Sequence, residues 1–425
     1  MGKKRERRAG PRAAPPPSDS LPDSRAEPYR KFTKLLLLFL VPVIPATLYY
    51  TLTSHPPALA PSWDTDTDRP YVYRRGLVTT DITYRQVLNE HMRTSKNSSQ
   101  RNFDNPVLAY ITPWNSKGYD MAKKFNNKFT HLSPVWYELQ SQGTNLVLEG
   151  RHNSDKGWIA EIRSRGNVLV LPRVVLEAIP VDLLKKKKQA TKAINIIVAE
   201  CKEMEYDGIV LESWSRWAAY GVLHDPDMRN MALQFIKQLG QAMHAANLQV
   251  VYVIGPPRSD KLEEHDFGPD DLKSLGNHVD GFSLMTYDFS GPQNPGPNAP
   301  LKWIHSTLSL LLDANAAHHR KLAKKLFIGI NFYGNDFVVS GGLGGGPILG
   351  TEYLSLLEKH GPQLQWERNS AEHYFVYGDE QDTKHVVFYP SLMSMSMRLE
   401  EALSWGAGIS IWEIGQGLEY FFDIL

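Results

Sequence analysis

The chain has 425 residues, of which 42% are hydrophobic and 22% charged, enough for one large barrel or two smaller domains. Its formal net charge is +1, which gives no reason to expect a nucleic-acid partner. The single cysteine, Cys201, excludes an internal disulfide, and we expect it to be a buried filler on a helix. The histidines show no metal-binding spacing, so we expect neither a metal nor a cofactor.

The first hundred residues predict a membrane anchor. Residues 1–34 form a basic tail with almost no apolar periodicity, which predicts disorder in the cytosol. Residues 35–53 are apolar and match the length of a helix that spans a bilayer. The basic flank precedes this segment, so the positive-inside rule predicts a single-pass type II signal anchor of the secretory pathway. Residues 54–104 then form a stalk and lead-in, and the rest of the chain is lumenal or extracellular.

A cleaved signal peptide is the competing prediction for this end of the chain. Ala58-Leu59-Ala60 has the small-x-small form of a cleavage site. The long region before the apolar segment argues against cleavage, and so does Pro61 directly after the site. Asn97 begins a glycosylation sequon in a polar stretch, which suits lumenal exposure under either prediction.

Residues 105–425 show short apolar runs separated by amphipathic helical segments, and this alternation predicts a (β/α)8 barrel. A doubly wound open sheet is the alternative, but such sheets usually have fewer strands. The eight predicted strand runs are 107–114, 129–139, 168–175, 207–213, 248–257, 279–290, 325–334 and 406–417.

The connection after the seventh run is too long for one helix. At about 335–397 we predict an inserted small sheet with a helix near 352–360. The segment GGLGGGP at 341–347 has no following Lys-Ser or Lys-Thr, so we expect a flexible loop rather than a phosphate cradle. Lys185 to Lys188, which lie before the fourth run, are expected to be a solvated helix face.

The fourth run, YDGIVLESW at 206–214, ends in an acid and a large aromatic side chain. Alternation along a strand would place Val210, Glu212 and Trp214 on one face, so that Trp214 covers Glu212. The structural alternative is a solvated Glu212 at a strand end and a Trp214 that belongs to the core.

The strand ends together resemble the family 18 glycoside hydrolases, the chitinases. The similarity rests on Asp207-Gly208, Met285–Asp288, Asn331–Tyr333 and Trp412, in that order along the chain. Segments 109–120, 280–288, 295–301 and 410–425 are further similar to one subgroup, the chitinase domain-containing or stabilin-interacting chitinase-like proteins.

The resemblance implies that the usual reaction fails. The family's signature on strand four is D-G-x-D-x-D-x-E, and its last Glu protonates the glycosidic oxygen while the substrate's acetamido group attacks. Here Val210 and Glu212 stand at the inner Asp positions and Trp214 stands at the proton donor. An indole has no titratable proton in the useful range. If the chain were active, Glu212 with Asp288 would be the candidate pair, but Glu212 lies roughly 6–7 Å deeper along the strand.

The resemblance also implies a saccharide site. Trp412 would form the floor of the central subsite, because an aromatic face packs against the apolar side of a pyranose. Asp288 could instead serve as an internal hydrogen-bond partner that holds strand six to strand four. The expected ligand-binding set is Trp114, Glu212, Trp214, Met285, Tyr287, Asp288, Asn331, Tyr333 and Trp412, with Trp136 and Trp217 as further candidates.

The sequence therefore predicts a non-catalytic lectin for chitooligosaccharides or other N-acetylglucosamine-containing glycans. One alternative is a family 18 hydrolase that uses Glu212. A second is a scaffold in which Trp214 plugs the pocket and the barrel surface binds a protein in the lumen.

Overall fold

The computed structural model describes residues 69–425 except 98–99, 258–261, 313–318, 341 and 343. The chain divides into two units, 1–62 and 63–425, and everything described belongs to the second. The predicted basic tail, membrane anchor and cleavage site lie outside the described residues. Within the described ranges, no helix has both the length and the apolar character needed to cross a bilayer.

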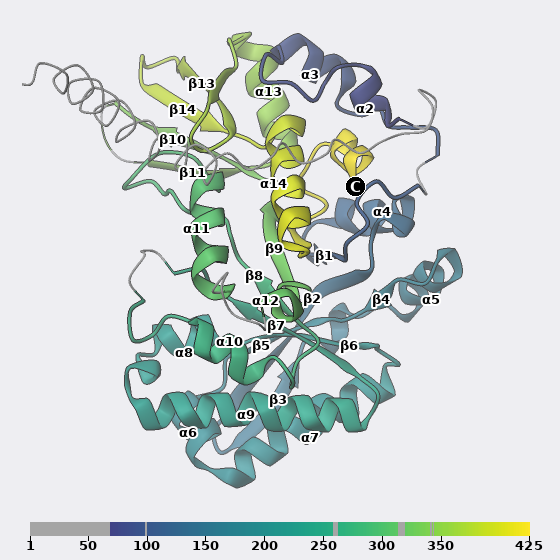
Figure 1. The fold of residues 1–425 in the computed structure, drawn as a ribbon, viewed down its shortest axis with the longest axis vertical. Helices are drawn as coiled ribbons and strands as arrows, with labels where there is room; N and C mark the ends of the chain where they lie inside the picture. The colour runs from purple at the N-terminus through teal and green to yellow at the C-terminus, as the bar shows by residue number, and fades with distance from the viewer. Residues whose placement is uncertain (1–68, 98–99, 258–261, 313–318, 341, 343) are drawn as a thin grey trace, which may run out of the picture. The chain divides into compact units, whose positions relative to one another are not determined.

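Eight parallel strands close into a barrel (Figure 1). Closure is shown by β1, which pairs with β2 on one side and with β15 on the other. This confirms the predicted barrel and rules out the open sheet. In order around the barrel the strands are β1 (Val107–Ile111), β2 (His131–Gln142), β5 (Arg173–Leu176), β6 (Gly208–Glu212), β7 (Gln249–Ile254), β8 (Gly281–Leu284), β9 (Leu326–Asn331) and β15 (Gly408–Trp412).

Two short strands extend this sheet. β3 (Asn145–Glu149) pairs antiparallel with the end of β2, and β4 (Leu169–Val170) pairs with its beginning. The barrel strands are apolar on both faces because both faces are buried. Val210 of β6 belongs to the cluster that fills the barrel, whereas Ile209 and Leu211 face the surrounding helices. The remaining members of the inner cluster are Leu108, Tyr110, Leu171, Val251, Val253 and Phe327.

Helices surround the barrel, and α7 and α9 run side by side along its lower edge in Figure 1. Asp225 caps α9 by accepting from the backbone N–H groups of Asp227 and Met228, and Pro226 occupies the first helical position. These helices are α4 (Ser116–Lys124), α5 (Lys156–Arg165), α6 (Pro180–Lys185), α7 (Lys187–Glu203), α8 (Trp214–Ala219), α9 (Pro226–Ala245), α10 (Pro269–Leu275), α11 (Leu301–Leu312), α12 (His319–Ala323) and α14 (Leu392–Trp405).

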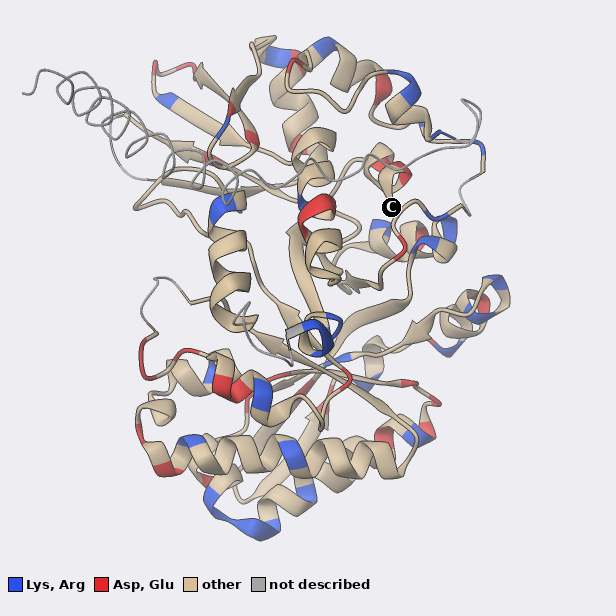
Figure 2. Cartoon of the chain, in the orientation of Figure 1, with Lys and Arg blue, Asp and Glu red and all other residues tan. Residues whose placement is uncertain are grey.

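The chain segments singled out on α6 and α7 have ordinary structural roles. Lys185 to Lys188 are all exposed, as expected, and Figure 2 shows basic residues gathered around α6 and α7. Cys201 of α7 is buried, and burial raises the pKa of its thiol to about 12, so it is not a nucleophile at neutral pH. Short 3₁₀ helices lie at Asn126–Lys128, Arg151–Asn153, Val222–His224 and Glu419–Ile424.

A second, antiparallel sheet lies between β9 and α14, in the stretch where the sequence predicts an inserted sheet. Its strand order is β11-β10-β14-β13-β12. The helix α3 of the lead-in packs against α13 of this region. The elements are β10 (Gly334–Val338), β11 (Gly344–Ile348), α13 (Gly350–His360), β12 (Gln365–Glu367), β13 (Glu372–Gly378) and β14 (Lys384–Phe388), with α2 (Tyr71–Arg74) and α3 (Tyr84–Glu90) in the lead-in.

The expectation that the glycine-rich segment is a flexible loop is wrong for Gly344–Ile348, which forms β11 against β10. The two strands pair through backbone hydrogen bonds, which do not require alternating apolar side chains. The segment therefore has no alternation from which its strand could be predicted. At Gly345, φ is +87° and a Cβ atom would lie 2.0 Å from the carbonyl oxygen of Asp336. Only glycine fits there, so the glycines allow close backbone approach rather than flexibility.

Candidate functional site

The barrel mouth, where the strands end, carries the residues that sequence analysis singled out. The buried cluster inside the barrel closes it from below. Met285, just after β8, and Trp412, at the end of β15, pack on top of that cluster and are only partly buried. In a (β/α)8 barrel this end hosts the functional site.

Glu212 ends β6 and is 7% exposed. Its Oε2 accepts from the guanidinium of Arg173 on β5, with the Nε to Oε2 distance 2.8 Å, and its Oε1 accepts from the Ser215 hydroxyl at 3.1 Å. The Arg173 guanidinium also lies over the Trp412 ring, 5.5 Å from its centroid. Every one of these contacts uses Glu212 as an acceptor, whereas a general acid must donate a proton.

The prediction that Trp214 shares a face with Glu212 and covers it is wrong. The strand ends at Glu212, and Ser213 turns the backbone (φ −150°, ψ −33°) into α8, whose first residue is Trp214. Alternation of faces holds only while the backbone stays extended. The buried indole donates from Nε1 to the carbonyl oxygen of His265 at 2.9 Å and packs against Phe267. Trp214 is therefore part of the wall and does not plug the barrel.

Asp288 follows β8 and is exposed. The alternative role, an internal hydrogen bond that holds strand six to strand four, is wrong in its partner, because the bond goes to strand seven. Its φ is +59°, and its backbone N–H donates to Asn298 Oδ1 at 2.7 Å. Its carboxylate accepts from the hydroxyl of Tyr333, whose burial raises the pKa of that phenol well above its usual range. Asp288 thus joins the end of strand six to the end of strand seven. The Nδ2 of Asn331 donates to the carbonyl oxygen of Tyr333 at 2.7 Å.

A hollow of about 620 Å³ opens beside these residues, above the ends of β6, β7 and β8. This is within the usual range for a small-ligand site. A hollow of about 740 Å³ lies elsewhere, against the lead-in, so position at the strand ends rather than volume singles this one out. The lining residues are Trp214, Ser215, Ala218, Gly255, Pro256, Glu263, His265, Asp266, Phe267, Met285, Tyr287, Asp288, Phe289 and Trp303.

The structure brings some expected residues to this hollow and not others. Trp214, Met285, Tyr287 and Asp288 line it, whereas Glu212 does not. Trp412 packs on the inner cluster, as Met285 does, and is not among the residues that line the hollow.

The other tryptophan candidates divide between surface and core. Trp114 is 71% exposed after β1. Trp136 is buried and donates to the Tyr119 hydroxyl at 2.8 Å, and Trp217 is also buried. Trp136 and Trp217 are therefore core residues and not platforms for a ligand. Asn97 is exposed, and its glycosylation stays a prediction.

Sequence analysis missed Arg173, Phe289 and Trp303. Arg173 was detectable as a lone charge within an apolar strand run, since a charge there needs a buried partner. Phe289 is 43% exposed, and its ring lies 5.1 Å from that of Trp303 on α11. Phe289 follows β8 and Trp303 lies on α11, so no local sequence pattern indicates that these two rings are in contact. Among the described residues, no group of three or more His, Cys, Asp or Glu side chains is placed to hold a metal ion.

Comparison with known proteins identifies this barrel. The model of the glycosyl hydrolases family 18 matches residues 181–417. The chain belongs to this family. Among curated proteins of Bacillus subtilis (strain 168), the uncharacterized glycosylase YvbX is 26% identical over 204 residues, which is 47% of this chain and 57% of that protein. The cortical fragment-lytic enzyme is 23% identical over 198 residues, 45% of this chain and 44% of that protein. The chain thus spans about half the length of these relatives.

Solved family 18 structures show the same fold. A chitinase from Chromobacterium violaceum ATCC 12472 matches with a TM-score of 0.63 at 20% identity, over 75% of this chain and 98% of that one. A GH18 chitinase from Cycas revoluta in complex with (GlcNAc)3 matches with a TM-score of 0.61 at 15% identity, over 75% and 97%. At these identities the likeness establishes the chitinase-like fold and leaves activity to the residues of the site.

Proposed function

We propose that this family 18 chain binds saccharides that contain N-acetylglucosamine, such as chitooligosaccharides, without cleaving them. One observation carries the proposal: the motif position of the family's proton donor holds Trp214, whose indole is hydrogen-bonded into the wall of the hollow. Glu212, the carboxylate that ends the same strand, is paired with Arg173 and does not line the hollow. With an indole at that position, the family's usual proton transfer to the glycosidic oxygen lacks its donor.

The hollow supports binding on chemical grounds. Its wall combines aromatic rings with exposed polar groups such as Asp288 and Glu263. Aromatic faces pack against the apolar side of a sugar ring, and the polar groups bond its hydroxyls. Met285 of this wall and Trp412, which packs on the same inner cluster without lining the hollow, are both partly buried. The Cycas revoluta chitinase with this fold was solved with (GlcNAc)3, which supports the choice of ligand class.

We place this activity in the secretory pathway, anchored through residues 35–53, and assign the chain to the stabilin-interacting chitinase-like subgroup that its segments resemble. The support is the uncharged length and basic flank of the anchor segment. Membranes from expressing cells should retain the full-length chain after a carbonate wash. Release of a shortened soluble form would instead favour cleavage after Ala60.

The test of binding is titration of the detergent-solubilised full chain with chitotetraose, together with an assay for new reducing ends. We expect measurable affinity, no reducing ends, and weakening by about tenfold in Trp412→Ala, the scale of one lost aromatic contact. Trp366→Ala is the matched control, because Trp366 lies on β12 and lines the separate hollow against the lead-in.

Two results would replace the proposal. Turnover that disappears in Glu212→Gln would establish the hydrolase alternative. Absence of affinity for chitotetraose and for a wider set of glycans would favour the protein-binding scaffold.

A further inference from the structure

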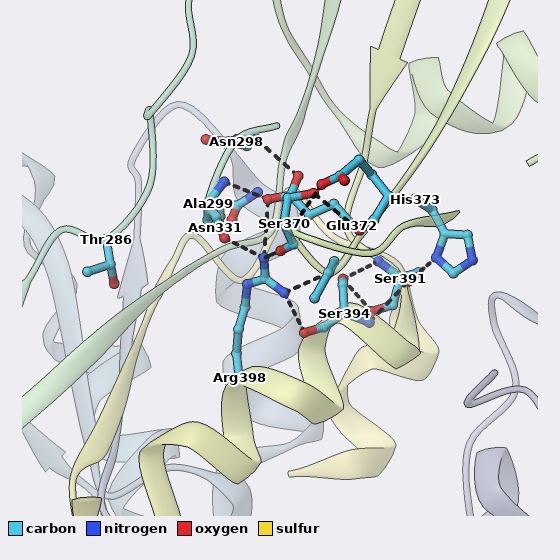
Figure 3. A network of polar contacts seen from close by, with 12 residues as sticks. Thr286, Asn298, Ala299, Asn331, Ser370, Glu372, His373, Ser391, Ser394 and Arg398 are labelled. Carbon is cyan, nitrogen blue, oxygen red and sulfur yellow. Dashed lines mark hydrogen bonds and ion pairs between the residues drawn. The ribbon is translucent and has the colours of Figure 1, made fainter. Parts of the chain in front are cut away.

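A buried ion pair lies behind the loop that carries Asp288. Glu372, the first residue of β13, and Arg398 of α14 approach to 3.1 Å, with side chains only 7% and 3% exposed. Figure 3 shows Arg398 rising from α14 toward Glu372 and the chain around Asn298 and Ala299. Burial raises the pKa of Glu372 and lowers that of Arg398. A pair this deep costs free energy to desolvate, so its hydrogen bonds decide what it does.

Arg398 ties three backbone segments together. It donates to the carbonyl oxygens of Ala371 at 3.1 Å, Ser370 at 3.2 Å and Ser394 at 2.7 Å. It also donates to the carbonyl oxygen of Ala299, which belongs to the loop between β8 and α11. The guanidinium therefore fixes this loop against the inserted sheet and α14.

Glu372 holds the same loop from its N–H side. Its Oε2 accepts from the backbone N–H of Asn298 at 3.0 Å, and its Oε1 accepts from that of Ala299 at 2.7 Å. The ion pair thus engages both N–H groups and the Ala299 carbonyl. Charge-assisted hydrogen bonds of this kind are about twice as strong as neutral ones.

Asn298 connects the ion pair to the residues that line the hollow. Its side-chain oxygen accepts from the N–H of Asp288 at 2.7 Å, and its carbonyl oxygen accepts from the N–H of Phe289 at 2.9 Å. Asp288 holds a left-handed backbone conformation, which is unfavourable for a residue with a Cβ and persists where surrounding bonds impose it. Its carboxylate accepts from the Tyr333 hydroxyl, and both Asp288 and Phe289 line the hollow.

We propose that Glu372, Arg398 and Asn298 are positioning residues for the saccharide site: they fix Asp288 and Phe289 through the loop 288–299 without touching the ligand. This rests on the proposed function for its saccharide part. The inserted sheet then serves binding by holding one wall of the hollow in place. A fixed wall loses less conformational freedom when a ligand binds, so affinity depends on residues that the ligand never contacts.

The experiment compares Glu372→Gln and Asn298→Ala with wild type in the full chain. Asn298→Ala removes the side-chain link to Asp288 but leaves the ion pair, so it remains informative if Glu372→Gln fails to fold. The matched control is Asp336→Asn on β10, which breaks a less deeply buried pair of the same sheet, with His385 at 2.9 Å. The readouts are hydrogen exchange at the Asp288 and Phe289 amides and the Kd for chitotetraose.

Both test variants should speed exchange at these two amides by about tenfold or more, because local opening becomes easier. They should also weaken chitotetraose binding by about tenfold, whereas Asp336→Asn changes neither quantity. Exchange that is unchanged in both variants would overturn the proposal, and so would faster exchange with unaltered affinity. If wild type binds no saccharide, the proposed function fails while the exchange measurement still decides whether these residues hold the loop.

Discussion

Two arginine–glutamate pairs in this molecule have the same chemistry and different surroundings. Glu372–Arg398 is surrounded by backbone: its carboxylate accepts from two N–H groups and its guanidinium donates to four carbonyl oxygens. Glu212–Arg173 is surrounded by side chains, with the Ser215 hydroxyl on the acid and the Trp412 ring beneath the guanidinium. A pair that bonds backbone fixes the path of the chain. A pair that bonds side chains fixes the positions of those side chains, here at the barrel mouth.

The comparison also explains how this barrel can keep a buried acid at the end of β6. The Arg173 guanidinium compensates the charge of the buried Glu212 carboxylate, so this acid has a structural partner within the barrel. Three changes would break or sharpen the contrast between the two pairs, in decreasing order of expected effect.

The largest effect is expected for Arg398→Met. It leaves Glu372 buried without its cation and four carbonyl oxygens without their donor, and should cost roughly 3–5 kcal/mol of the free energy of unfolding. Urea denaturation of the full chain measures this. The double variant Arg398→Met/Glu372→Gln should recover part of the loss, because no uncompensated charge stays buried. A single variant as stable as wild type would contradict the structural role given to the pair.

A smaller effect is expected for Arg173→Met, roughly 2 kcal/mol, because Ser215 still donates to Glu212. This change also removes the cation from the Trp412 ring, so chitotetraose affinity should fall along with stability. Arg398, in contrast, acts on affinity only through the loop 288–299. Arg173→Lys keeps the charge without the planar guanidinium and should recover stability better than affinity. If Arg173→Met lowered stability and left affinity untouched, the Glu212–Arg173 pair would have no part in binding.

A third buried carboxylate sharpens the contrast because, within the described residues, no ion pair joins it. Glu413 accepts from Asn115 Nδ2 at 2.6 Å and from the N–H of Gly415 at 2.9 Å. Burial raises its pKa from the ordinary 4.5 to about 6, despite these hydrogen bonds. The folded state therefore binds a proton more tightly than the unfolded state, and stability falls as pH rises from 4.5 to 6.

Glu413→Gln should remove this part of the pH dependence, which is at most about 2 kcal/mol, at about 1.36 kcal/mol per pH unit. The measurement is the free energy of unfolding of both chains from about pH 4 to about pH 7, in steps of about one pH unit. Glu358→Gln on the exposed face of α13 is the control and should leave the wild-type profile unchanged. An identical slope in wild type and Glu413→Gln would show that another group is responsible.

The sequence alone determined the barrel and its family, because eight apolar runs and the order of their end motifs are properties of the linear chain. It also determined that Trp214 stands where the family's signature has its proton donor, since counting from Asp207 needs no coordinates. Burial of Cys201 and exposure of Lys185 to Lys188 followed from helical pattern and charge.

Only the tertiary structure decided where these side chains go. Alternation could not reveal that the strand ends at Glu212 and sends Trp214 into the wall, because face assignment fails once the backbone turns. Glu372 lies 74 residues from Asn298 in the chain, and glycines of β11 pair through backbone alone. Such contacts leave no local pattern, since hydrogen bonds between distant segments form only when the whole fold brings them together.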